Sequence, residues 1–159
     1  MASHLRDMTG SRASGDRRRW VVALVLWVCV IWGHSLMPGD SSSEESPAFL
    51  NIIRPLFEAL GMQDADFMHL IVRKAGHFSE YLVLGMLAST AFGLGTGARN
   101  ALLATCVIWV AIPCVDETIQ LFVPDRVGAV TDVLIDMAGF ATGLALRMAY
   151  RALRGRGRR

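Results

Sequence analysis

The sequence has almost no charge within its apolar stretches, and this shortage excludes an ordinary soluble domain. Of 159 residues, 53% are hydrophobic and 19% are charged. The charges are bunched, however, and residues 20–37 and 101–115 contain no Asp, Glu, Lys or Arg. A bilayer favours long apolar helices, because helices satisfy their own backbone hydrogen bonds. The sequence therefore predicts an all-α membrane protein with a single helical bundle.

Motifs for metals, phosphates and nucleophiles are also missing. The chain has no HExxH, no glycine-rich phosphate loop and no activated-serine motif, so no cofactor and no metal site is assigned from motifs. Its three cysteines lack CxxC spacing and cannot all pair with one another. We expect Cys29, Cys106 and Cys114 to be small buried residues, the usual environment of a free cysteine.

Arginines gather at both ends of the chain, before the first apolar run and after the last. They are not interleaved with aromatic residues, which argues against a nucleic-acid partner. Flanking basic residues mark the cytoplasmic ends of membrane spans. We therefore expect a disordered basic tail over 1–18, a membrane domain over 19–150 and a basic cytoplasmic tail over 151–159. No cleavage site follows the first apolar run, which predicts a retained anchor helix.

Four apolar segments predict four transmembrane helices, at about 19–37, 75–94, 101–115 and 132–150. The second belongs to a longer helix, which is expected to begin at the N-cap Asp64 and to end at Phe92 before several glycines. Pro113 is expected to kink the third span, and a polar stretch over 116–131 is expected to follow it. Apolar residues at helical spacing over 49–60 predict a short amphipathic interfacial helix.

Two clusters of polar residues stand out against this apolar background. The first contains Lys74, His77 and Tyr81 on one helix face, with Glu80 beside them. The second cluster consists of Asp116, Glu117, Gln120, Arg126, Asp132 and Asp136. Four crossings and cytoplasmic termini put both clusters at the outer membrane–water boundary. We predict that they form one mixed-charge binding site.

Charged groups at membrane depth are costly, and they point inward, where they pair or line a wet cavity. One interpretation is that these residues only join helices. The number of carboxylates exceeds what joining helices requires, which favours a functional site. Gly139 and Gly143, on one side of the fourth span, are expected to allow close contact between helices. Gly85 is expected to lie on the same helix face as Lys74, His77 and Tyr81.

Three motifs, in this order along the chain, resemble the VanZ-like family. They are Arg-Lys-x-x-His-Phe-x-Glu-Tyr at 73–81, Asp-Glu-x-x-Gln-x-Phe-Val-Pro-x-Arg at 116–126 and Asp-Val-x-x-Asp-x-x-Gly at 132–139. The chain departs from the usual pattern at Asp125, where a glycine is usual, and at Asp136, where an asparagine is usual. The second departure adds a carboxylate to the site. The resemblance implies a small, multi-pass protein of the bacterial plasma membrane. The founding member of the family is associated with teicoplanin resistance, and no established catalytic activity comes with the family.

The first hypothesis is that the site binds the headgroup of an anionic lipid, such as a polyprenyl-phosphate-linked cell-wall precursor. Lys74, Arg126 and protonated His77 would bind the phosphate through charge-assisted hydrogen bonds. Such binding would modulate the cell envelope or its susceptibility to glycopeptides.

Two further hypotheses stay open. His77 with Asp116 or Glu117 suits acid–base catalysis in a membrane hydrolase or transferase acting on a lipid phosphate, or His77 with carboxylates would hold a divalent metal. Alternatively, the chain is a structural modulator of an envelope enzyme, with the 49–60 segment docking the protein partner. The residues do not decide whether the protein is an enzyme.

Overall fold

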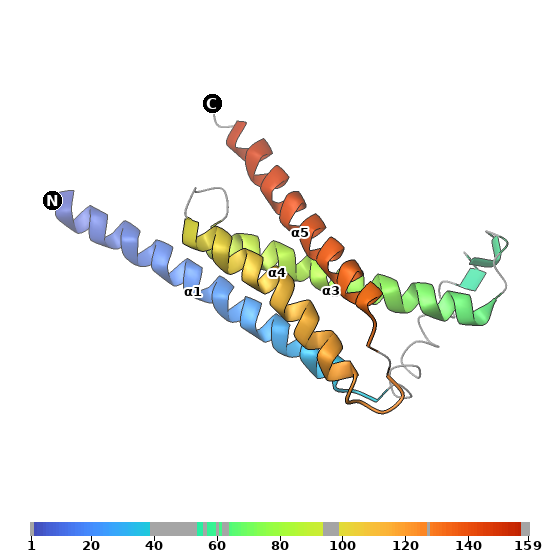
Figure 1. Cartoon of the computed structure of the whole chain (residues 1–159). Helices are drawn as coiled ribbons and strands as arrows, with labels where there is room; N and C mark the ends of the chain where they lie inside the picture. The colour runs from blue at the N-terminus through green and yellow to red at the C-terminus, as the bar shows by residue number, and fades with distance from the viewer. Residues whose placement is uncertain are drawn as a thin grey trace.

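The computed structural model describes residues 2–38, 54–55, 57–59, 61, 64–93, 99–126 and 128–156, with side chains from Asp16 onward. The long elements of this part are all α-helices: α1 (Ala2–Ser35), α3 (Ala65–Phe92), α4 (Arg99–Gln120) and α5 (Val130–Arg156). Figure 1 shows these four helices, with α1 and α4 running alongside each other and α3 crossing the middle. The all-α prediction is confirmed.

Helix α3 has the boundaries that the sequence predicts. The Asp64 side chain accepts hydrogen bonds from the backbone N–H groups of Asp66 and Phe67, which caps the first turn. At the other end, Gly93 adopts a left-handed conformation with φ of 64°, and its N–H donates to the Ser89 carbonyl. Glycine adopts this conformation without steric cost. Local capping chemistry therefore sets both ends of α3.

The apolar core lies where α3 contacts the other helices. Helix α3 packs against α1, α4 and α5, and its most extensive contact is with α5. Leu24 and Ile31 of α1 meet Tyr81 and Leu84 of α3, and Phe140 of α5 completes this buried cluster. Because α3 is surrounded by neighbours, polar residues on it are held inside the bundle.

Three glycines bring α3 and α5 into backbone contact. A Cβ atom added to Gly143 would collide with the carbonyl oxygen of Leu82, and one added to Gly139 would collide with that of Phe78. On the opposite helix, a Cβ atom at Gly85 would meet the carbonyl oxygen of Phe140. The expectation of close packing at Gly139 and Gly143 is confirmed, and Gly85 makes the same kind of contact.

The outer surface of the bundle is strongly apolar. Helices α4 and α5 are each long and apolar enough to cross a membrane, and only 22% of the most apolar window of each is buried inside the fold. Leu26, Val107 and Leu134, on three different helices, are more than half exposed. An apolar surface of this extent suits a protein that contacts lipid. Of the four predicted spans, α4 and α5 meet these criteria by length and composition, while α1 and α3 do not.

The tails differ from expectation. A disordered segment was expected up to residue 18, but α1 begins at Ala2, because Ala, Leu, Met and Arg in this segment favour helix. At the other end, α5 continues through Arg156 into the predicted basic tail. Most of the predicted amphipathic helix, residues 49–60, lies outside the described residues.

The prediction of buried cysteines was wrong. Cys29, Cys106 and Cys114 are all exposed on the outer surface of the bundle. The usual burial of a free cysteine reflects transfer from water into an apolar interior. A thiol on the outside of a lipid-facing helix already has apolar surroundings, so it gains little from burial.

The predicted third span, at about 101–115, lies within the longer helix α4, which continues through Asp116 and Glu117 to Gln120. Pro113 lies inside the helix and is buried. A proline removes one backbone hydrogen bond, and tertiary contacts of the following turn offset that loss. The first residues of the predicted polar stretch therefore sit on the end of α4.

Candidate functional site

Polar side chains from α1, α3, α4 and α5 meet at one end of the bundle. This is the end where α1 and α4 finish and where α5 begins (Figure 1). The hydroxyl of Ser35, the last residue of α1, donates to the Asp116 carboxylate, and the Gln120 side-chain amide donates to Ser35 Oγ at 3.4 Å. These bonds tie the end of α1 to the last turn of α4.

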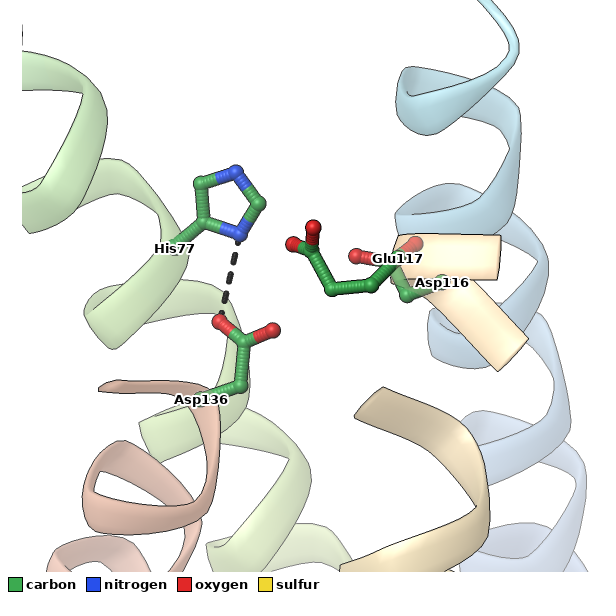
Figure 2. A group of neighbouring side chains, drawn as sticks. All are labelled: His77, Asp116, Glu117 and Asp136. Carbon is green, nitrogen blue, oxygen red and sulfur yellow. Dashed lines mark hydrogen bonds and ion pairs between the residues drawn. The ribbon is translucent and has the colours of Figure 1, made fainter. Parts of the chain in front are cut away.

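The centre of the site is a buried quartet, which we define as His77, Asp116, Glu117 and Asp136. Figure 2 shows that the imidazole of His77 and the three carboxylates point toward one another from α3, α4 and α5. One nitrogen or oxygen atom from each residue can be chosen so that all four lie within 4.8 Å of one another. His77 Nδ1 is 3.2 Å from Asp136 Oδ1, a hydrogen-bonding distance. The structure thus brings four of the predicted site residues together.

Protein groups fix one oxygen of each carboxylate in the quartet. Asp116 accepts from Ser35, Asp136 is hydrogen-bonded to His77, and Glu117 Oε2 accepts from the backbone N–H of Ala129 at 2.8 Å. The fully buried Tyr81 is close enough to interact with Asp116 but does not reach hydrogen-bonding geometry. Groups outside the quartet thus hold Asp116 and Glu117 in place, whereas His77, within the quartet, holds Asp136.

A cationic layer lies beside the quartet, around Asp132. Lys74 forms an ion pair with Asp132, and the Arg73 Nη2 atom is 3.6 Å from the other oxygen of the same carboxylate. Arg73 also donates to the Gln120 side-chain oxygen at 3.3 Å. Asp132 is in the first turn of α5, where the helix dipole favours a negative charge. The side chains of Arg73 and Lys74 are 38% and 27% exposed, so both remain reachable from outside.

Arg126 binds the end of α1 rather than a carboxylate. Its Nε and Nη2 atoms donate to the carbonyl oxygens of Met37 and His34 at 3.2 and 3.1 Å. Partial burial, and then the nearby Arg73 guanidinium, lower the pKa of Arg126 below its usual value. Arg126 thus anchors the connection between α4 and α5 to α1 and lies close to the cationic layer.

Replacing Arg126 with glutamine should loosen this connection. We expect the rate of amide hydrogen exchange in residues 121–126 to rise by about tenfold. Glutamine is too short to reach both carbonyls, and each hydrogen bond from a charged donor contributes about 1.5–3 kcal/mol. Hydrogen–deuterium exchange in detergent checks the prediction, with Arg99→Gln at the far end of α4 as the control. Equal exchange in the two variants would contradict the anchoring role.

Glu80, a predicted binding residue, faces α1. Its carboxylate lies 2.8 Å from His34 Nδ1, and its backbone carbonyl accepts a hydrogen bond from Trp27 Nε1 at 2.9 Å. Both contacts join α1 to α3 beside the site. Glu80 is therefore brought to the same end of the bundle but stands outside the quartet.

Three residues of the site were not predicted from the sequence as site residues: His34, Ser35 and Arg73. His34 lies in the last turn of α1 and contacts the Glu80 carboxylate. A polar His-Ser pair at the end of a long apolar span was the available signal for the first two. Arg73 stands next to Lys74 in the first motif, and its importance appears only in its contact with Asp132.

Fold and site together define a helical, membrane-type protein with a carboxylate-rich polar site buried at one end of its bundle. The VanZ/LLP1 family matches residues 20–151, a range that includes every member of this site. The chain belongs to that family. Neither the curated proteins nor the solved structures contain a match to the chain.

Proposed function

We propose that the chain crosses the bacterial plasma membrane four times, with both termini in the cytoplasm and the site near the outer leaflet. The arginines at both ends of the sequence support this orientation. The exposed Val22, Val25 and Leu26 of α1 support a lipid-facing role for that helix. Helix α3 carries residues of the polar site, and these residues lower its apolar content. Neighbouring helices cover α3 on several sides.

We further propose that the site binds the phosphate headgroup of a membrane lipid. The observation that carries this proposal is the position of Arg73, which lies within electrostatic range of both Lys74 and Arg126. Like charges that lie this close repel, and an anion between them relieves the repulsion. All three are only partly buried, so a ligand reaches them without unfolding the bundle.

The chemistry of these groups suits a phosphate or pyrophosphate. Guanidinium groups offer paired donors that match phosphate oxygens, and lysine adds a mobile point charge. His77 is paired with Asp136 in the quartet, so in this proposal Arg73 takes the role first expected of His77. The exposed apolar surfaces of α1 and α4 would hold the lipid tail. A polyprenyl-phosphate-linked cell-wall precursor fits both requirements, and its capture would change susceptibility to glycopeptides such as teicoplanin.

Binding can be measured with polyprenyl phosphate in nanodiscs that contain the full chain. We expect Arg73→Gln and Lys74→Gln each to weaken binding by about tenfold, since each removes a charge-assisted contact of about 1.5–3 kcal/mol. Arg99→Gln removes an exposed cation from the opposite end of α4 and should leave binding unchanged. Equal affinity of the wild type for polyprenyl phosphate and for the uncharged polyprenol would overturn the proposal.

One observation supports a second candidate function, a hydrolase or transferase acting on a lipid phosphate. The contact between His77 and Asp136 fixes the imidazole ring next to Glu117, as the ring of a general base is commonly fixed. Release of inorganic phosphate from polyprenyl diphosphate in the same nanodiscs, lost in His77→Gln, would favour this function over binding alone. The third hypothesis, docking of an envelope protein by residues 49–60, stays a prediction.

A further inference from the structure

The quartet has a feature that neither helix packing nor the binding of an anion explains. Each of its carboxylates keeps one oxygen that is buried and accepts no hydrogen bond from the described residues: Asp116 Oδ2, Glu117 Oε1 and Asp136 Oδ2. The three residues are 1%, 6% and 0% exposed, respectively. A buried polar atom without a partner costs free energy, and a charged one costs more. Three such oxygens in one cluster indicate that they share a partner.

The shared partner must be positively charged. Carboxylates gathered this closely cannot all ionise unless a cation or protons lie between them. Lys74, the one lysine of the chain, and Arg73 both face Asp132, and Arg126 donates to backbone carbonyls. His77 contributes at most one positive charge against three carboxylates, and its Nδ1 atom is engaged with Asp136.

The donor set indicates which cation fits. The four ligand-type atoms lie within 4.8 Å of one another, a spread that suits atoms surrounding one ion. Imidazole nitrogen is a ligand of Zn²⁺ and other transition metals, whereas Mg²⁺ and Ca²⁺ prefer oxygen ligands alone. One imidazole with three carboxylates therefore favours a divalent transition metal over Mg²⁺ or Ca²⁺.

We propose that His77, Asp116, Glu117 and Asp136 form a binding site for a divalent transition metal ion, Zn²⁺ or Mn²⁺. The groups that hold the second oxygens, Ser35 and the Ala129 amide, orient the carboxylates around the ion. The site lies beside the cationic layer but shares no residue with it. The two proposals thus rest on different residues, and either can fail without the other.

The test uses the full chain in mild detergent, stripped with EDTA and then dialysed against Zn²⁺ or Mn²⁺. We expect about one metal ion per chain by mass spectrometry of the metal content. Asp136→Asn and Glu117→Gln should each weaken the affinity by about tenfold or more, because each removes a charged ligand. Asp125→Asn, which changes an exposed carboxylate at a left-handed position that asparagine tolerates, should bind as the wild type does.

Thermal unfolding separates a metal site from a purely structural cluster. Without metal, Asp136→Asn should be at least as stable as the wild type, because it relieves repulsion among the carboxylates. With metal, the wild type and Asp125→Asn should gain more stability than Asp136→Asn and Glu117→Gln, because these two bind the metal more weakly. The proposal is overturned if neither Zn²⁺ nor Mn²⁺ binds stoichiometrically to the wild type, or if Asp136→Asn and Glu117→Gln bind the metal unchanged. Tighter binding of Mg²⁺ or Ca²⁺ than of Zn²⁺ and Mn²⁺ would overturn the assignment of a transition metal.

Discussion

Replacing Gly143 with alanine is expected to destabilise the bundle, whereas the same change at Gly76 is expected to stabilise it. At Gly143 the new methyl group would collide with the Leu82 carbonyl oxygen, which belongs to the backbone of a neighbouring helix and has no rotamer to change. Overpacking of this kind costs about 1–3 kcal/mol, because the helices must separate. The separation would also move His77 away from Asp136.

Gly76 is the matched control because it also lies within a helix but has open space around it. A Cβ atom there meets nothing within 4 Å, so alanine should add about 0.5–1 kcal/mol through its higher helix propensity. The unfolding midpoints of the two variants in detergent should therefore move in opposite directions. Shifts of the same sign would show that α3 and α5 do not meet through their backbones.

Replacing Asp132 with alanine is expected to have the largest electrostatic effect. The side chain is 2% exposed and interacts with both Lys74 and Arg73. Removing one partner of a buried ion pair costs about 3–5 kcal/mol, because the remaining charge is left without compensation. The loss should appear as a lower free energy of unfolding and as poor recovery of the folded protein from detergent.

Two comparisons make this prediction specific. Changing Lys74 to methionine in the Asp132→Ala background should recover part of the lost stability, since it removes the uncompensated charge. Asp16→Ala breaks a pair with Arg19 in which both side chains are largely exposed, and it should change stability by less than about 1 kcal/mol. An Asp132→Ala variant as stable as Asp16→Ala would contradict the role of Asp132 as the centre of the cationic layer.

The sequence predicted those parts of the fold that depend on local chemistry. The boundaries of α3 follow from the capping side chain of Asp64 and from the freedom of Gly93 to adopt a left-handed conformation. The close contact at Gly139 and Gly143 follows from their spacing of one helical turn on a single face. The quartet was predicted because charges within apolar segments are too costly to stay unpaired or to face lipid.

Features that depend on tertiary partners escaped prediction. The helical conformation of the first residues of the polar stretch was not predicted, since Asp116 gains its partner from Ser35, 81 residues earlier, and Glu117 from Ala129, beyond the turn that follows α4. The exposed cysteines were missed for a different reason. The usual burial of free cysteine assumes that water surrounds the protein. The outer surface of this bundle is apolar, so that assumption does not apply here.

The backbone contact between α3 and α5 also separates the residues of the quartet into two groups. His77 and Asp136 come from α3 and α5. The backbones of these two helices are in direct contact at glycines, so together they form one frame. Asp116 and Glu117 come from α4, which has less extensive contact with that frame and is linked to α1 through Ser35. A change in the spacing of the quartet would therefore move α4 relative to this pair of helices more readily than it would separate α3 from α5, because α3 and α5 have the most extensive contact in the bundle.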